Sequence, residues 1–530
     1  MNDQLNNLAP LSSKHQRPQS RTLQLILAAA ALTFGLGGCA TNPVTGKSEI
    51  SIISEAWELK TGKQQYAPAR QSQGGDYLAD EAVQAYVNEV GQKVAAVSDR
   101  KLPYEFSVIN NGVPNAWALP GGKISINRGL LTELGSEAEL AAVLGHEVVH
   151  SAARHGAKGV ERGTILQATT AVAGIATANT DYGKYVAMGA GLGSQLINSR
   201  YGRSAESESD RYGMDYMSRA GYNPQGAVDL QQTFVDLSGQ KDSSFFDGLF
   251  ASHPPSQQRL EANKAYAQML PKGGVTGKAR YQQVMARLIE TKPAYENYEK
   301  AQQMANDNRP KEARKLVNQA IKMEPNEGHF HSFLGDLELD AKRYTSAQNA
   351  YAEAIELNPG FFYPHLQSGI TSEKQGALNQ AKLRLNRSLE LLPTAQAYNA
   401  LGNIAERQGN TDEAREYFAA ASQDPSASGQ AALNSLIKID VARNPGAFIG
   451  IRYGRNEASA IQIEVANRAP RAFNNVVLSI RYIDQKGNAR STQRQINLLG
   501  ASEAKLINTG LVSPQGEVQI SVVRATLIER

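Results

Sequence analysis

The segment SEAELAAVLGHEVVHSAARH, residues 136–155, determines how the N-terminal half of the chain is interpreted. Ser136 and the glutamate three positions later have the spacing of a capping box, and apolar residues follow at helical intervals, so a helix is expected to begin here. His146 and His150 are four residues apart, which on a helix places both imidazoles on one face, where they can bind one Zn²⁺ ion. Glu147 lies beside the first histidine, in the position of a general base. An H-E-x-x-H pattern also occurs by chance, so a zinc peptidase helix needs independent support from a third ligand.

The third ligand can be sought by elimination, because catalytic zinc sites use three protein ligands. Ala153 and Gly156 stand where the metzincin pattern has a glycine and a third histidine. A nearby following helix cannot supply a glutamate, as in thermolysin-like enzymes, because no acidic residue lies between positions 161 and 181. In the later segment ESESD, Glu206 and Asp210 are four residues apart and so share a helix face. Glu206 is therefore the candidate third ligand, and Asp210 is the candidate carboxylate that holds a ligand histidine by its other ring nitrogen.

Four segments occur in an order that is typical of one peptidase family. They are NAWALPGGKISINRGLL (115–131), LGHEVVHSAARH (144–155), YGRSAESESDRYG (201–213) and SHPPSQQR (252–259). With these segments the chain resembles the gluzincin metallopeptidases of the HtpX and BepA type, the family that also contains the CAAX prenyl proteases. The resemblance implies a mainly α-helical zinc-peptidase domain with a small sheet over residues 76–290. It also implies that Glu206 is a ligand and Asp210 an orienting residue, although Ser209 replaces the usual alanine.

The resemblance implies two alternative roles for His253 in the segment SHPPSQQR. In the first, His253 donates a hydrogen bond to the oxyanion of the tetrahedral intermediate, alongside Arg259, and contributes to catalysis. In the second, His253 occupies the fourth position of the zinc in the resting state and acts as a brake. The brake is the preferred alternative, because an always-open protease would threaten normal folding intermediates. A loop histidine without either role is the third alternative.

The segment GGKISINRGLL raises a further choice. Ile124 and Ile126 alternate with polar residues, which predicts a strand. In zinc peptidases of this kind, a strand edge beside the site pairs with an extended substrate backbone. Alternation fits equally well a core strand that is paired on both sides, so both possibilities stay open.

The beginning of the chain has the order of a secretory signal. A basic stretch is followed by an apolar run from residue 23 to residue 38 and then by Cys39. This run is too short for a stable membrane span, and residues 1–38 are expected to be a signal peptide. LGGC resembles the bacterial lipobox, which implies a lipid on Cys39. By resemblance to bacterial lipoproteins, Ala40 favours the outer membrane, and residues 39–75 are expected to form an arm.

Composition excludes several classes of partner and fold. The formal charge of +4 falls to +2 when residues 1–38, with three basic residues and one acidic residue, are removed. A nearly neutral chain argues against nucleic acid as a partner. Cys39 is the single cysteine, so no disulfide can form within the chain. Residues 164–198 are rich in Ala, Gly and Thr but are interrupted by polar and charged residues, so a packed helical hairpin is expected rather than a membrane span.

The second half of the chain is repetitive. Pro325, Pro359 and Pro393 are 34 residues apart, and an alanine lies twelve residues before each of them. This pattern resembles the tetratricopeptide repeat and predicts an α-solenoid of four units over residues 291–426. The solenoid is expected to bind polypeptides and assembly proteins of the envelope or outer membrane, although it could also serve only as a spacer. Three histidines in it are interpreted as ordinary repeat residues: His329, His331 and His365.

Residues 446–530 have a different character. Five short β-rich segments are separated by turn signals and predict a C-terminal β-sandwich: AIQIEVANRAP, NNVVLSIRYID, INLL, AKLINTG and VQISVVRATL. No catalytic pattern is visible in them. Partner recognition and a purely architectural role are both open.

Together these features predict a multidomain zinc metalloendopeptidase at the periplasmic face of a bacterial outer membrane, anchored by lipid. Resemblance to BepA-like proteins implies quality control of misassembled outer-membrane proteins. The alternative is a repeat-based chaperone or scaffold for envelope assembly with little proteolysis.

Overall fold

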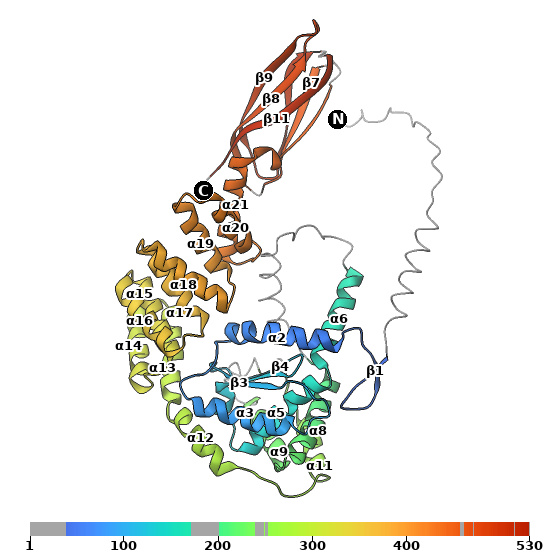
Figure 1. Ribbon diagram of the computed structural model, residues 1–530, viewed down its shortest axis with the longest axis vertical. Coiled ribbons are helices and arrows are strands. Elements are labelled where there is room, and N and C mark those ends of the chain that lie inside the picture. Colours follow the sequence, from blue (N-terminus) through green and yellow to red (C-terminus); the bar gives the residue numbers. More distant parts are fainter. Residues whose placement is uncertain are drawn as a thin grey trace, which may run out of the picture.

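The computed structural model describes residues 39–170, 201–238, 249, 253–455, 460–469, 471–512 and 515–528. The predicted signal peptide and most of the hairpin expected over residues 164–198 lie outside these ranges. In Figure 1 the N-terminal half forms a helical body around a small sheet, the helical repeats curve away from this body, and a β-rich unit lies at the far end. No helix within the described ranges is long and apolar enough to cross a membrane.

A mixed three-stranded sheet lies inside the helical body. Its strands are β3 (Glu105–Ile109), β4 (Ala116–Leu119) and β5 (Lys123–Asn127). Strand β5 lies between the other two, parallel to β3 and antiparallel to β4. Ile124 and Ile126 are buried in the apolar cluster, while Ser125 on the opposite face is buried in hydrogen bonds with Ser107 and Tyr66. Of the two possibilities left open for this strand, the structure shows the core strand, because β5 pairs with β3 on one side and with β4 on the other, and β3 and β4 are the outer strands of the sheet.

The helices surround this sheet. Helix α2 covers one face, and α3 and α5 lie against the other (Figure 1). A short hairpin of β1 (Cys39–Thr41) and β2 (Ser48–Ile50) precedes them. The helix bounds are α2 Glu55–Ser72, α3 Glu81–Ala95, α4 Arg128–Leu131, α5 Glu137–Ala152, α6 His155–Thr170, α8 Arg203–Arg219, α9 Gln225–Ser238, α11 Gln257–Ala267 and α12 Lys278–Glu290.

The predicted capping box begins α5. The Ser136 hydroxyl oxygen accepts a hydrogen bond from the Glu139 backbone N–H at 3.2 Å, as the sequence predicts. The Glu139 carboxylate accepts from the Ser136 hydroxyl at 3.0 Å and from the Gly135 N–H at 3.0 Å. These bonds satisfy backbone donors that a buried helix end would otherwise leave unpaired, and so they fix where the helix starts.

Two glycines allow α5 and α8 to approach closely. A Cβ atom on Gly145 would lie 2.9 Å from the carbonyl oxygen of Gly213, and a Cβ atom on Gly213 would lie 3.0 Å from the backbone nitrogen of His146. Any larger residue at these positions would separate the two helices. Because His146 and Glu206 come from these two helices, this contact determines whether their side chains can meet.

The repeats form four helix pairs between residues 292 and 421, all of them described, which confirms the predicted tetratricopeptide pattern. In three units a glycine of the first helix faces a large side chain of the second: a Cβ on Gly335 would lie 2.4 Å from the Tyr351 ring. The pairs are α13 Lys292–Asn306 with α14 Pro310–Met323, α15 Gly328–Asp340 with α16 Tyr344–Leu357, α17 Phe362–Lys374 with α18 Leu378–Leu391, and α19 Ala395–Arg407 with α20 Thr411–Ala421.

The first repeats share their core with the peptidase part. One buried apolar cluster contains residues of α3 and α5 and also Tyr295 and Phe330 of the repeats. The Arg128 guanidinium lies over the Tyr295 ring at 3.4 Å from its centroid. Asn110 donates a hydrogen bond to Glu327 at 2.8 Å, and both groups are buried. The beginning of the solenoid is therefore packed onto the peptidase part and is not a loosely tethered module.

The C-terminal part consists of two three-stranded antiparallel sheets after helix α21 (Ala427–Arg443) and the short helix η2 (Pro445–Ala447). Ile463 and Leu478, from different sheets, belong to the same buried cluster. The prediction of a β-rich C-terminal unit is thus confirmed at the level of two small sheets. Their strands are β6 Ile449–Arg455, β7 Ala460–Asn467 and β10 Ala504–Val512 in one sheet, and β8 Phe473–Ile483, β9 Ala489–Leu499 and β11 Gln515–Leu527 in the other.

Candidate metal centre and active site

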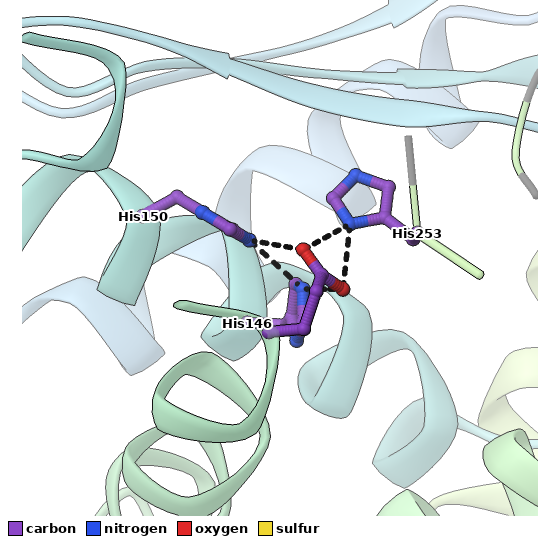
Figure 2. Close-up of side chains that lie close together, drawn as sticks. His146, His150 and His253 are labelled. Atoms are coloured by element: carbon purple, nitrogen blue, oxygen red, sulfur yellow. Dashed lines mark hydrogen bonds and ion pairs between the residues drawn. The ribbon is translucent and has the colours of Figure 1, made fainter. Parts of the chain in front are cut away.

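Three predicted ligands from two helices meet in the buried interior. The Nε2 atoms of His146 and His150 are 3.0 Å apart. The Glu206 carboxylate from α8 lies 3.5 Å from His146 Nε2 and 3.4 Å from His150 Nε2. Figure 2 shows the two imidazoles of α5 and the ring of His253 turned toward one another. Helical spacing of four residues and the glycine contact between α5 and α8 together produce this convergence.

The donor geometry fits a zinc ion. Two ligands of a tetrahedral zinc ion, each about 2.0–2.1 Å from the metal, lie about 3.3–3.4 Å apart. The two histidine nitrogens are 3.0 Å apart, Glu206 Oε1 lies 3.4 Å from His150 Nε2, and Glu206 Oε2 lies 3.5 Å from His146 Nε2, so each histidine has a different carboxylate oxygen close to that distance. Oxygen and imidazole nitrogen are both common zinc ligands in catalytic sites. His146, His150 and Glu206 can therefore hold zinc without a change of backbone.

The charges of these groups also suit a cation. Burial lowers the pKa of His150 well below its usual value, so its imidazole is neutral and has a free lone pair. Burial alone would raise the pKa of Glu206, but the neighbouring His253 and His146 outweigh it and keep the carboxylate ionised. Burial would lower the pKa of His146, yet hydrogen bonds to Asp210 and Glu206 raise it to about 10. The raised pKa shows that the two carboxylates favour positive charge at His146, and a bound cation would supply that charge in place of the second ring proton.

Asp210 and Arg259 hold the first ligand in place. Asp210 Oδ1 lies 3.0 Å from His146 Nδ1, so the ring nitrogen that faces away from the cluster has a carboxylate partner. The Arg259 guanidinium donates to both oxygens of Asp210 at 2.6 and 2.7 Å and lies 3.1 Å from Glu206. Its remaining donor reaches the Pro254 carbonyl oxygen at 3.0 Å. Arg259 is therefore fully engaged with the carboxylates and with the chain next to His253.

Glu147 has a different environment from the ligands. It is 2% exposed, and its Oε2 atom has no hydrogen-bond partner within the described part of the chain. Burial raises the pKa of Glu147. Its side chain lines a cavity together with His146 and apolar residues such as Met214 and Phe234. A buried carboxylate with an unpaired oxygen beside the donor cluster is suited to accept a proton from a water molecule.

His253 lies beside the three predicted ligands as a fourth side chain that could bind a metal ion. Its Nδ1 atom lies 3.2 Å from each carboxylate oxygen of Glu206, and Figure 2 marks these two contacts of His253 with dashed lines. Its Nε2 atom lies 3.6 Å from Glu147. His146, His150, Glu206 and His253 each offer one donor atom, and these four atoms lie within 4.8 Å of one another. The loop before α11 thus brings a distant histidine to the metal-binding group.

The structure brings together seven of the eight predicted site residues: His146, Glu147, His150, Glu206, Asp210, His253 and Arg259. The eighth, Cys39, is the first residue of β1. Sequence reasoning assigned no role to Tyr201, whose ring stacks on His150 with centroids 3.9 Å apart. It also assigned none to His155, whose ring contacts His150 from the side away from the cluster. The available signal was that His155 stands in the segment of the two histidine ligands and that Tyr201 opens the segment of Glu206.

Comparisons with known proteins agree with this site. Residues 81–267 match peptidase family M48, and residues 298–360 and 369–428 match tetratricopeptide repeats. Over 225 residues the chain is 30% identical to the mitochondrial metalloendopeptidase OMA1 of Schizosaccharomyces pombe, which covers 41% of this chain and 63% of that protein. It is 26% identical over 433 residues to the beta-barrel assembly-enhancing protease of Escherichia coli, covering 71% of this chain and 88% of that one. It is 28% identical over 255 residues to the Escherichia coli metalloprotease YcaL, covering 46% and 96%.

The region that matches the peptidase family contains every member of the buried cluster, from His146 to Arg259. The two repeat matches fall on the helix pairs that follow it. The chain therefore carries a zinc metalloendopeptidase domain of peptidase family M48, followed by tetratricopeptide repeats.

Proposed function

We propose that this protein is a lipid-anchored endopeptidase that degrades misassembled outer-membrane or envelope proteins at the periplasmic face of a bacterial outer membrane. The observation that carries the enzymatic part is the convergence of His146, His150 and Glu206 beside the unpaired oxygen of Glu147. The substrate class follows from similarity to the beta-barrel assembly-enhancing protease over 71% of this chain. A chaperone or scaffold with little proteolysis is less favoured, because such a function does not require this cluster.

In the proposed mechanism, His146, His150 and Glu206 hold the ion. Zinc, when bound, makes water acidic enough to attack at neutral pH and polarises the scissile carbonyl group. Glu147 accepts the proton of the attacking water and later donates it to the leaving amine. Asp210 keeps the His146 proton on Nδ1, so that Nε2 is free to act as the ligand.

Arg259 has a positioning role in this proposal. Its bonds to Asp210 and Glu206 fix the two carboxylates that orient and complete the ligand set. This engagement argues against the alternative in which Arg259 stabilises the oxyanion, because its guanidinium would have to leave both carboxylates. Of the two residues considered for oxyanion stabilisation, His253 and Arg259, this leaves only His253.

His253 acts as a brake in the resting protein. A zinc site that performs catalysis keeps one position open, whereas a site with four protein ligands is closed. The Nδ1 atom of His253 lies within the four-donor group, which supports a closed resting site. Catalysis then requires His253 to move away from the fourth position. The alternative to the brake is that His253 stabilises the oxyanion, and a His253 variant distinguishes the two roles.

The substrate backbone is proposed to pair with β4. Among the described strands, β4 pairs only with β5, and Ala116 at its start lines the cavity with His146 and Glu147. Pairing through backbone groups tolerates many substrate sequences, as a quality-control protease requires. This role replaces the one that was considered for β5.

We divide the chain into a signal peptide (1–38), an arm (39–75), a peptidase domain (76–290), the repeats (291–426) and a β-sandwich (446–530). The shared apolar cluster of the two C-terminal sheets supports the sandwich. The repeats deliver polypeptide to the peptidase domain and contact envelope assembly proteins, since stacked helix pairs present a concave surface for extended peptides.

A truncation tests the delivery role. Because α13 to α15 share the peptidase core, the deletion should spare them and remove residues 394–530, starting at the end of the third helix pair. The truncated protein is expected to hydrolyse short peptides at a rate within about twofold of the full chain, because no site residue is removed. Cleavage of an unfolded outer-membrane protein is expected to be lost. Equal loss of both activities with zinc retained would mean that these parts support the catalytic fold instead.

A second variant tests the anchor. Cys39→Ser is expected to move the protein from the membrane fraction to the soluble periplasmic fraction, because no described helix can cross a membrane and the thiol is the site for the lipid. Fractionation after a high-salt wash measures this. Retention of Cys39→Ser in the washed outer membrane would show that a protein partner is the anchor.

A further inference from the structure

A chain of hydrogen bonds continues outward from His150. The Nε2 atom of His150 faces the donor cluster, and its Nδ1 atom lies 2.9 Å from Nδ1 of His155, the first residue of α6. The other nitrogen of His155, Nε2, lies 3.4 Å from Oε1 of Glu208. His150 and His155 are 1% and 4% exposed, so water does not compete for these contacts.

The direction of the hydrogen bonds along this chain follows from the ligand. A histidine that binds a metal through Nε2 carries its proton on Nδ1. His150 must therefore donate to His155, whose Nδ1 must accept. The His155 proton is then on Nε2, where it is donated to Glu208. The hydroxyl of Ser209, at 3.5 Å, is the other group near His155 Nδ1.

The series of hydrogen bonds that starts at His150 ends in the N-terminal arm. Asn42 is 2% exposed, and its Nδ2 group donates to Oε1 of Glu208 at 3.1 Å and to Glu49 at 3.2 Å. Its Oδ1 atom accepts from the backbone N–H groups of Val44 and Thr45 and so forms a tight turn. One side chain thus shapes the arm and contacts the carboxylate that holds His155.

Contacts with α6 hold the N-terminal arm beside this series of hydrogen bonds. Oε1 of Glu161 on α6 accepts hydrogen bonds from the Ser51 hydroxyl and from the N–H groups of Ile52 and Ile53. Lys158, also on α6, forms an ion pair with Glu49 at 2.5 Å. Oε1 of Glu208 thus lies within reach of both His155 Nε2 and Asn42 Nδ2.

We propose that His155 is a positioning residue for the zinc ligand His150, and that Asn42 in the N-terminal arm completes its support through Glu208. His155 fixes the tautomer and the ring plane of His150, while Tyr201 stacks on the same ring. Asp210 does the corresponding work for His146, so both imidazole ligands have an assigned partner. The arm is then a part of the metal centre. This inference rests on the proposed zinc peptidase function.

Zinc affinity provides the first test, measured on the full chain by competition with a chelator of known affinity. His155→Ala is expected to raise the zinc Kd by about 10- to 100-fold, the usual range for loss of a group that orients a metal ligand. His155→Asn places an oxygen acceptor near the position of Nδ1 and should recover part of this loss. Asn42→Asp keeps the turn-forming oxygen but removes the donor to Glu208, so it should also weaken zinc binding.

Lys158→Gln is the matched control, because it removes the ion pair between Glu49 of the arm and α6 while leaving the side chains of His155, Glu208 and Asn42 in place. Its zinc Kd should stay within about twofold of the native value, since ion pairs that are partly exposed to solvent contribute little. The absorption bands of the cobalt-substituted protein report ligand geometry directly. They should shift in His155→Ala and Asn42→Asp and stay unchanged in Lys158→Gln.

Unaltered zinc affinity and an unaltered cobalt spectrum in His155→Ala and Asn42→Asp would overturn the inference. Equal weakening in Lys158→Gln would overturn it too, because docking of the arm and not the hydrogen-bond chain would then be responsible. Both results leave the proposed function intact if the native protein binds zinc and cleaves peptides. Absence of zinc from the native protein would instead refute the proposed function itself.

Discussion

Glu147→Gln is expected to retain one zinc ion per chain while its proteolytic rate falls by about 10²- to 10⁴-fold, the contribution typical of a general base. Glu147 is not a member of the four-donor group, and its Oε2 atom has no partner among the described residues, so the amide can replace the carboxylate without disturbing the ligands. The amide cannot accept the proton of the attacking water. Metal analysis and hydrolysis of a short peptide by the same preparation measure both quantities.

His146→Ala is the control for this prediction, because it removes a ligand and should lose both zinc and activity. The two substituted residues are neighbours on α5, so a loss of activity caused by general damage to this helix would be seen in both variants. If Glu147→Gln loses zinc to the same extent as His146→Ala, Glu147 serves the ion and its assignment as a base is wrong.

His253→Ala is expected to raise basal proteolysis by about tenfold or more. If His253 occupies the fourth position for most of the time, the active form is a minority of about one molecule in ten, and removal of the imidazole makes it the majority. The position of Nδ1 within the four-donor group is the reason for this expectation. Initial rates with a short peptide and with an unfolded protein substrate measure the change.

His331→Ala provides a matched control, because His331 is a half-buried residue of the repeats, outside the donor cluster, whose ring nitrogen bonds to the Pro325 carbonyl oxygen. It should leave the rate unchanged. A fall of about 10²- to 10³-fold in His253→Ala would instead identify an oxyanion donor. An unchanged rate with both substrates would reject both roles of His253.

The parts of the site that the sequence predicted are those determined by local geometry. The capping box at Ser136 and the four-residue spacing of His146 and His150 depend only on neighbours along the helix. Glu206 could be identified as the third ligand because no acidic residue lies between positions 161 and 181, which excluded a ligand from that segment. Family resemblance supplied His253 and Arg259, which lie about a hundred residues from His150 and have no local signal.

The features that the sequence could not predict depend on packing between distant segments. Alternation in β5 did not reveal that β3 and β4 would pair with it on both sides, or that Ser125 would be buried in hydrogen bonds with Ser107 and Tyr66. His155 acquires its role only because α8 brings Glu208 to its far side. The repeat pattern likewise did not show that Phe330 would share a core with the peptidase part.

The most direct test of the central claim is anomalous diffraction at the zinc absorption edge from crystals of the full chain. The proposed site predicts one strong peak, about 2.0–2.2 Å from Nε2 of His146, Nε2 of His150 and a carboxylate oxygen of Glu206. Their present separations of 3.0 to 3.5 Å already correspond to such a position. A peak held by other residues, or no peak between these three side chains in protein that cleaves peptides, would contradict the account.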